Sequence, residues 1–350
     1  MKAINHWFLF LLLTVIFISG CRKDDPEAIS GKFENGIIVV NQGLFQSGKG
    51  TLDFIHADTD STSYEIFESA NGGQILGNVA QSAAANDEFI FVALNNSAKI
   101  VVADRENMKY VREINGISQP RYLIADNTNL IASAWGDGFT GSVNIYNAAT
   151  GTLMHEISGL RGPEQMLQTA QGVFVPCSGG YSTDNRVFLI NPLSGIKIDS
   201  FVVGDRPLSL VQAESEIYLL CSGKFDWVEP ENNTPGGLWN WNGSTFSLVA
   251  ELPNGVSELT YLPSNKSLYF LNGSMLGTLD LNSSGFTYYN IDASVPNALK
   301  AFEINGTQQL LIADALDYVS AGKVYFVDSQ GSTLRSLPTG IIPGYFMKLD

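Results

Sequence analysis

Short apolar segments alternate with polar, turn-forming segments along nearly the whole chain. Seven stretches share one design, in which apolar flanks surround a centre rich in Asn, Asp, Gly and Ser. They are LDFIHADTDSTSYEIF (52–67), IVVADRENMKYVREI (100–114), VNIYNAATGTLMHEI (143–157), VFLINPLSGIKIDSF (187–201), LWNWNGSTFSLVAEL (238–252), GTLDLNSSGFTYYNI (277–291) and VYFVDSQGSTLRSL (324–337). Two apolar runs joined by such a turn predict a β-hairpin, so each stretch is expected to form two antiparallel strands.

A second pair of apolar runs precedes these hairpins, as in YLIADNTNLIASA (122–134) and LTYLPSNKSLYFL (259–271). Each repeat therefore contains four strands. Prolines mark the repeat at intervals of 43, 44, 46, 43 and 47 residues, at Pro120, Pro163, Pro207, Pro253, Pro296 and Pro343. A period of this length in a strand-rich chain is typical of a β-propeller with one four-stranded blade per repeat.

The two ends of the repeat region complement each other. The first repeat begins at GIIVVNQG (36–43) and lacks the innermost strand that should precede it, whereas YFMKLD (345–350) is one strand left over. The predicted fold is thus an all-β, seven-bladed propeller over residues 36–350, whose ring is closed by the C-terminal strand. Closure would leave only short, protected strand edges.

The N-terminus predicts a targeting segment instead of part of the fold. Residues 1–20 contain Lys2 and the apolar run WFLFLLLTVIFI (7–18), which is too short to span a bilayer comfortably and is typical of a signal peptide. The run ends in ISGC (18–21), which resembles the lipobox of bacterial lipoproteins, in which the cysteine becomes the acylated N-terminus. The alternative is an ordinary secretory signal with an incidental Cys21.

The segment after Cys21 is predicted to be a lipidated N-terminus and linker, residues 21–35. It opens with RKDDPE (22–27), which resembles the surface-export tag of some lipoproteins. Acyl chains would anchor the protein to the membrane without spanning it. The expected location is the outer membrane, on the cell surface.

Net charge excludes one class of partner. The full chain carries 20 Lys and Arg against 35 Asp and Glu. Nucleic-acid recognition needs clustered basic residues, so no nucleic-acid partner is expected.

The signals for an enzyme are weak. Beyond the signal segment the chain has only two histidines, His56 and His155, and it has no nucleophile elbow or phosphate-binding glycine loop. Cys177 and Cys221 occupy equivalent points of successive repeats and are expected to be small buried residues, although a disulfide is an alternative. We therefore predict no catalytic activity, no metal and no cofactor.

Candidate ligand contacts lie in the loops between the second and third strand of each repeat, which open on one face of a propeller. Several of these loops place an aromatic residue among Gly, Ser, Asp and Asn: Phe45, Trp135, Phe139, Tyr181, Phe225, Trp227 and Tyr318. Aromatic rings among hydrogen-bonding groups are the usual composition of a ligand-binding surface. The alternative is that these rings merely anchor their loops, as Trp239 and Trp241 are expected to pack inside a blade.

Several motifs resemble YncE-like propellers, in particular a branch found as surface lipoproteins. The stretch NVAQSAAANDEFIFVALNNSAKIVVADRENMKYVREINGISQPRYLIA (78–125) carries the resemblance, together with LRGPEQM (160–166), VGDRPLSL (203–210), ADALDYVSAGKVYFVD (313–328) and TGIIPGYFMK (339–348). This branch includes lipoproteins that capture cobalamin beside a TonB-dependent outer-membrane transporter. The resemblance implies a surface-anchored protein that binds a corrinoid or other small organic ligand and delivers it to such a transporter. Two alternatives remain, a non-catalytic scaffold that binds a protein or glycan, and a propeller enzyme of the lactonase or quinoprotein type.

Overall fold

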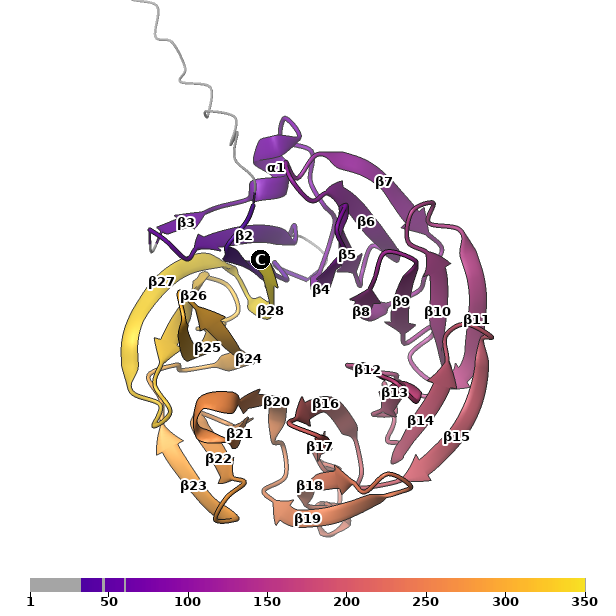
Figure 1. Cartoon of the computed structure of the whole chain (residues 1–350), viewed down its shortest axis with the longest axis vertical. Helices are drawn as coiled ribbons and strands as arrows, with labels where there is room; N and C mark the ends of the chain where they lie inside the picture. The colour runs from indigo at the N-terminus through magenta and orange to yellow at the C-terminus, as the bar shows by residue number, and fades with distance from the viewer. Residues whose placement is uncertain (1–32, 46–47, 60, 350) are drawn as a thin grey trace, which may run out of the picture.

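The computed structural model describes residues 33–45, 48–59 and 61–349. The predicted signal segment, Cys21 and most of the linker lie outside the described residues. The described chain forms seven four-stranded antiparallel sheets arranged as blades around a central channel (Figure 1). This confirms the predicted all-β, seven-bladed propeller.

The strands are numbered along the chain, and each blade is given from its innermost to its outermost strand. Blade 1 contains β28 (Pro343–Leu349), β1 (Gly36–Asn41), β2 (Thr51–His56) and β3 (Ser61–Ser63). Blade 2 contains β4 (Ala80–Ala85), β5 (Phe89–Leu94), β6 (Lys99–Asp104) and β7 (Tyr110–Asn115). Blade 3 contains β8 (Pro120–Ala125), β9 (Asn129–Ala134), β10 (Gly141–Asn147) and β11 (Leu153–Leu160). Blade 4 contains β12 (Leu167–Thr169), β13 (Gly172–Cys177), β14 (Arg186–Asn191) and β15 (Ile196–Val202).

The remaining blades follow the same order. Blade 5 contains β16 (Pro207–Ala213), β17 (Glu216–Cys221), β18 (Gly236–Trp241) and β19 (Phe246–Leu252). Blade 6 contains β20 (Ser257–Leu262), β21 (Ser267–Asn272), β22 (Met275–Asp280) and β23 (Gly285–Asn290). Blade 7 contains β24 (Pro296–Ile304), β25 (Thr307–Asp314), β26 (Ala321–Val327) and β27 (Thr333–Ile341). The short helices are α1 (Ile66–Ala70), η1 (Pro230–Asn232) and η2 (Pro263–Asn265).

The C-terminal strand closes the ring, as the sequence predicts. β28 pairs antiparallel with β1, with Val39 opposite Phe346 and Gly36 opposite Leu349. The first blade is therefore built from both ends of the described chain. Pairing of the chain ends leaves no unpaired inner strand at the seam.

Five of the six periodic prolines stand at or just before an innermost strand. Pro120, Pro207, Pro296 and Pro343 begin their strands, and Pro163 forms a bridge with Cys177 ahead of β12. A proline is tolerated at the first residue of a strand because the missing N–H is not needed there. The sixth proline differs, because Pro253 follows the outer strand β19 and a serine begins the inner strand of blade 6.

Blade 1 corrects one detail of the sequence prediction. The hairpin over residues 52–67 was expected to end in a full outer strand, but β3 stops at Ser63 and the chain turns into α1. Glu65 has a left-handed backbone, with φ of 48°, which breaks the strand direction. Ile66 and Phe67 then become fully buried between blades 1 and 2, so apolar burial outweighs the continuation of the sheet.

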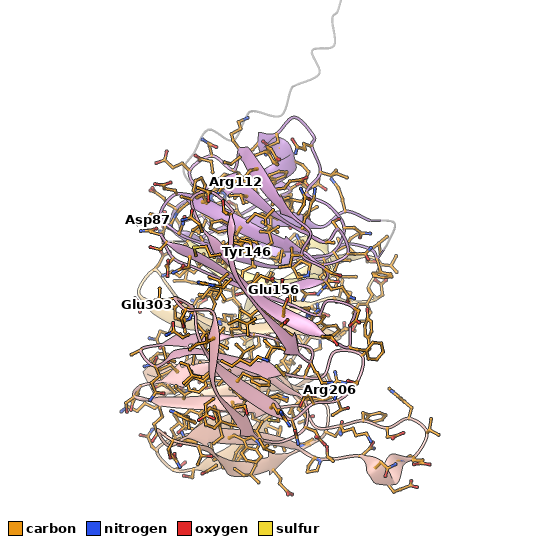
Figure 2. The ribbon with its side chains drawn as sticks, turned by 90° about the vertical axis from the view of Figure 1, so that its right-hand side faces the viewer. Asp87, Arg112, Tyr146, Glu156, Arg206 and Glu303 are labelled. Carbon is orange, nitrogen blue, oxygen red and sulfur yellow. The ribbon has the colours of Figure 1, made fainter. Side chains whose placement is uncertain are left out.

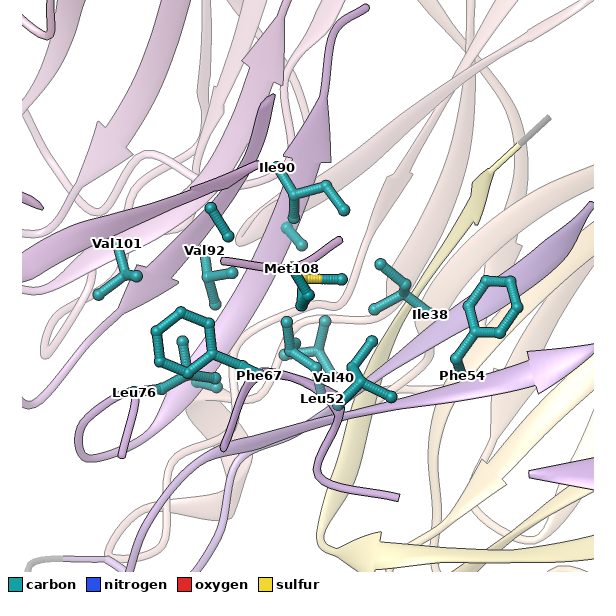
Figure 3. Close-up of a cluster of buried hydrophobic side chains, with 14 of the residues drawn as sticks. Ile38, Val40, Leu52, Phe54, Phe67, Leu76, Ile90, Val92, Val101 and Met108 are labelled. Carbon is teal, nitrogen blue, oxygen red and sulfur yellow. The ribbon is translucent and has the colours of Figure 1, made fainter. Parts of the chain in front are cut away.

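The core consists of seven apolar clusters, each involving neighbouring blades. Figure 3 shows the cluster between blades 1 and 2, where Ile38 and Val40 of β1 face Ile90 and Val92 of β5, with Met108 between them. Trp239 and Trp241 pack against the cluster of blades 4 and 5, which confirms their assignment as packing residues. Cys177 and Cys221 are buried free thiols, as expected, and burial raises the pKa of both, so neither is a reactive thiolate at neutral pH.

Candidate functional site

The loops between the second and third strands of the blades share one face of the ring with the connections between blades. Backbone hydrogen bonds tie the two kinds of loop together: Trp135 N–H donates to the Gln119 carbonyl at 3.0 Å, and Ser222 N–H donates to the Arg206 carbonyl at 2.9 Å. We call this side the loop face. Figure 2 views the ring from its edge, and the long loop carrying η1 projects on the side toward which Arg206 lies, away from Asp87 and Glu303.

All seven aromatic residues predicted as ligand contacts lie in loops of this face. Six of them are at least half exposed: Phe45, Phe139, Tyr181, Phe225, Trp227 and Tyr318. The largest exposure is 86 %, at Trp227. The seventh, Trp135, is half-buried. Single exposed apolar side chains are ordinary, but six aromatic rings on one face form a surface suited to an apolar partner.

Three of the predicted residues form one group across blades 3 and 4, which we call the aromatic triad: Trp135, Phe139 and Tyr181. The Tyr181 ring stands edge-on to both Trp135 and Phe139, with ring centroids 5.8 Å apart in each case. Tyr181 also donates from its hydroxyl to Gln119 Oε1 at 3.0 Å, and its backbone N–H donates to the Gly138 carbonyl at 2.8 Å. These contacts fix the rings in place before any ligand arrives.

Phe225 and Trp227 form a second pair in the long loop of blade 5, with ring centroids 4.3 Å apart. The Asp226 carboxylate between them accepts the backbone N–H groups of Val228 and Glu229, which turns the loop back on itself. Asn254 secures the base of the loop by donating to the Lys224 and Thr234 carbonyls. The pair is thus a structured projection from the face.

The other two predicted contacts stand apart. Phe45 lies in the loop of blade 1 and Tyr318 in the loop of blade 7, and within residues 33–45, 48–59 and 61–349 neither ring contacts the other five. The structure therefore brings five of the seven residues into two groups and leaves two separate.

Sequence reasoning missed the polar residues that line the channel at the loop face. In blades 2, 3 and 4 the residue after the start of each inner segment is Gln81, Arg121 or Glu164. Arg121 donates to Gln81 Oε1 at 2.7 Å and through Nε and Nη2 to one oxygen of Glu164 at 3.3 and 3.2 Å. The other oxygen of Glu164 accepts the Ser178 hydroxyl at 2.7 Å. The three blades are therefore joined across the channel wall by one hydrogen-bonded network.

Arg121 connects this network to the aromatic triad. Its guanidinium lies 4.4 Å from the Trp135 ring centroid, in a cation–π contact. The side chains of Arg121 and Glu164 are only 18 % and 5 % exposed, so their ion pair is shielded from water. Trp135 is therefore half-buried because it covers a charged residue of the channel, and it is a wall of the site more than an exposed contact.

On the opposite side of the channel, Glu258 of β20 and Lys300 of β24 line a common cavity together with Gln165 and Tyr345. Burial raises the pKa of Glu258 to about 7, and burial lowers the pKa of Lys300. Both side chains are half-buried, so solvent reaches them through the channel. This side of the channel carries two opposite charges that are held away from bulk water.

Two kinds of chemistry find little support in the geometry. No group of three or more His, Cys, Asp or Glu side chains within the described residues is placed to hold a metal ion. In the same part of the chain, no helix has the length and apolar character needed to cross a membrane. His56 contacts Ser63 at 2.8 Å and His155 contacts the Leu193 carbonyl at 3.1 Å, both away from the loop face.

Comparison with known proteins adds a family and a fold. The solved structure of a functionally unknown protein from Desulfotomaculum acetoxidans DSM 771 is 13 % identical, with a TM-score of 0.66, and the match covers 90 % of this chain and 100 % of that one. A quinoprotein alcohol dehydrogenase-like protein from Bacteroides thetaiotaomicron VPI-5482 is 11 % identical, with a TM-score of 0.65, and the match covers 90 % and 78 % of the two chains. At these identities the likeness concerns the fold alone.

No curated protein matches the chain. A family model described as "Domain of unknown function (DUF5074)" matches residues 35–213, which is just over half of the chain. The chain therefore belongs to the DUF5074 family.

Proposed function

We propose that this protein is a lipid-anchored binding protein of the outer-membrane surface, which holds an organic ligand on the loop face without chemical change. The leading candidate ligand is a corrinoid such as cobalamin, and the proposed recipient is a TonB-dependent transporter. The corrinoid and the transporter come from the resemblance to YncE-like surface lipoproteins. The lipid anchor comes from ISGC at residues 18–21.

The observation that carries the proposal is the set of exposed aromatic rings on the loop face. A large ligand that is partly apolar can cover the aromatic triad and the Phe225–Trp227 pair, since both project from the same face. Pockets for such ligands combine apolar walls with a few polar groups that fix orientation. The channel network of Arg121 and Glu164, which contacts the triad through Trp135, supplies such groups.

The ring architecture supports binding over catalysis. Five described residues of the face have rings fixed by ring contacts and hydrogen bonds, so little ordering is needed when a ligand binds. A catalytic site would need a nucleophile or a general base beside this surface. The histidines lie elsewhere, and both described thiols are buried and protonated.

Calorimetry of the purified protein against cyanocobalamin tests the proposal. We expect saturable binding of one corrinoid and a loss of about thirtyfold in affinity for Trp227→Ala, because truncating a central aromatic contact typically costs about 2 kcal/mol. The melting temperature of this variant should not change, since the ring is almost fully exposed. Leu193→Ala is the matched control, because Leu193 is 76 % exposed in the turn between β14 and β15, on the opposite face.

Trp135→Ala should behave differently from Trp227→Ala. Trp135 packs on Arg121 and Tyr181, so its removal should lower both the melting temperature and the affinity. If the wild-type protein binds no corrinoid but retains an outer-membrane receptor or a glycan on the same face, the scaffold alternative replaces this proposal. Turnover of a lactone or an alcohol would favour the enzyme alternative instead.

A further inference from the structure

A small cavity in the channel presents two opposite charges to the same space. It is lined by Glu258 and Lys300 from neighbouring inner strands, and by Gln165, Leu259, Ala298, Leu299, Tyr345 and Phe346. Its volume is about 10 Å³, which accommodates one water-sized group. The cavity can therefore take the end of one functional group and not a whole ligand.

The protein does not satisfy these two charges by itself. Within the described part of the chain, the ion pairs join other residues, so the ammonium of Lys300 and the carboxyl of Glu258 lie beyond ion-pair distance of each other. The backbone N–H of Leu299 is the group that approaches the Glu258 carboxyl. Arg121 directs its guanidinium to Gln81 and Glu164. Charged groups held away from water are normally paired, so this unpaired arrangement has spare capacity for a partner.

The neighbouring blades leave this side of the channel open. Glu258 and Lys300 are followed around the ring by Gly344 of blade 1, and they are preceded by Leu208 and Ser209 of blade 5, all of which offer no charge. On the far side, the space is filled by Arg121 and by Tyr122, whose ring lies 6.1 Å from that of Tyr345. A group that enters the channel from the loop face thus meets Glu258 and Lys300 on its less crowded side.

The pair selects by sign. A ligand cation would be repelled by Lys300 and by Arg121, and a ligand carboxylate would be repelled by Glu258 and by Glu164. A neutral group that accepts from Lys300 and donates to Glu258 satisfies both at once. A primary carboxamide has this combination, with a carbonyl oxygen and an NH₂ group on one carbon.

We infer that the Glu258–Lys300 cavity is a carboxamide-binding subsite, which holds one amide-bearing edge of the ligand at the mouth of the channel. This inference rests on the proposed function, because it supplies the polar contact for a ligand whose apolar part lies on the aromatic rings. Corrinoids carry primary carboxamides around their rim, which matches the subsite. The raised pKa of Glu258 and the lowered pKa of Lys300 keep both groups close to neutrality, and Arg121, Glu164, Tyr122 and Tyr345 are the other titratable groups that face them.

The experiment compares two ligands and matched variants of the full-length purified protein by calorimetry. Lys300→Met and Glu258→Gln each remove one charge at nearly constant shape, and the double variant removes both so that neither remains unpaired. We expect at least tenfold weaker binding of cyanocobalamin in each. The exposed Glu214–Lys266 ion pair, 2.8 Å long on the opposite side of the ring, provides the control: Glu214→Gln with Lys266→Met should bind within twofold of wild type.

The second ligand set consists of cyanocobalamin monocarboxylates, in which one rim carboxamide is replaced by a carboxylate. On the wild-type protein, one of these derivatives should lose at least tenfold in affinity, and Glu258→Gln should recover most of that loss, which a purely structural role would not produce. If every derivative binds the wild-type protein like the parent, or if the folded double variant binds cyanocobalamin within twofold of wild type, the subsite is refuted and the proposed function stands. If the wild-type protein binds no corrinoid, both fall together.

Discussion

Replacing Asp53 with asparagine should destabilise the whole ring, because this one carboxylate fastens the seam between the last and the first blade. Asp53 lies on β2 and is 1 % exposed. Its Oδ2 accepts from Asn41 Nδ2 at 2.9 Å, and from the Thr339 hydroxyl and the Gly340 N–H at 2.8 Å each. Its Oδ1 accepts from Glu65 N–H at 2.9 Å. Thr339 and Gly340 belong to β27, so the contacts join blade 7 to blade 1.

The magnitude follows from the number of donors. Asparagine has only one acceptor oxygen, so at least one of the four donors must face an NH₂ group. An unsatisfied buried donor costs about 1–3 kcal/mol, and hydrogen bonds to a charged acceptor are stronger than those to a neutral one by about 1 kcal/mol. Together these terms predict a loss of about 4 kcal/mol. For a propeller of ~315 residues the unfolding entropy is about 0.7 kcal/mol/K, so the melting temperature should fall by about 6 °C.

Thermal and urea denaturation of Asp53→Asn, followed by circular dichroism, measure this loss. Asp328→Asn is the matched control, because that carboxylate accepts two backbone N–H groups within its own turn and joins no blades. We expect it to shift the melting temperature by less than about 2 °C, which corresponds to a surface substitution. If Asp53→Asn melts no lower than this control, the seam hydrogen bonds contribute no net stability, and the pairing of β28 with β1 alone holds the ring closed.

Three further predictions concern other parts of the chain. Burial raises the pKa of Glu68 from 4.5 to about 7, so the stability linked to its protonated form is lost as pH rises from about 4.5 to 7; Glu68→Gln should therefore be more stable than wild type by up to about 3 kcal/mol at pH 8 and equal at pH 4, and a gain independent of pH would contradict this. Deleting residues 345–350 should lower the melting temperature of the entire ring, since this segment contains most of β28; a shift under about 2 °C would argue against closure by this strand. Cys21→Ser should release the protein from the membrane fraction or leave it unprocessed, whereas an unchanged, lipid-labelled membrane pool would remove the lipoprotein interpretation.

The fold could be predicted because its information is local and repeated. Each hairpin carries its own turn residues, and the near-constant interval between Pro120, Pro163 and Pro207 sets the blade length. Closure could be predicted from a surplus strand at one end and a missing strand at the other, and β28 with β1 confirms it. The prediction fails where tertiary burial competes with a local pattern, as at Ile66 and Phe67, whose alternation indicates a strand but whose burial in the core favours α1.

The loop face could be predicted in position but not in contact. Phe139 and Tyr181 are separated by 42 residues, and only the packing of blade 3 beside blade 4 brings their rings to 5.8 Å. Trp135 shows the same limit in another way. Its sequence neighbours are polar and suggest an exposed ring, yet Arg121, from the preceding strand, draws it inward as a cation–π partner.

The channel was out of reach of the sequence pattern because each blade contributes one polar residue, and one residue is not a motif. Arg121 and Glu164 follow the periodic prolines Pro120 and Pro163 directly, and Glu258 follows the serine that replaces the proline of blade 6. A polar residue at the first step into an inner strand was therefore the available signal. It becomes meaningful only once ring closure places those first steps around one axis.

The repeat and its exceptions have separate consequences for function. Features shared by all blades, such as the buried inner strands and the seam at Asp53, hold the ring rigid and so reduce the ordering cost of binding. Selectivity must then come from what is not repeated. The long loop with Trp227 occurs in one blade, and the two unpaired channel charges occur in blades 6 and 7, so a ligand can lie on the face in one orientation only, with its apolar part toward blades 3 to 5 and a polar edge toward Glu258 and Lys300. Loss of the rings and loss of the charges should consequently weaken binding independently, because the two groups contact different parts of the same ligand.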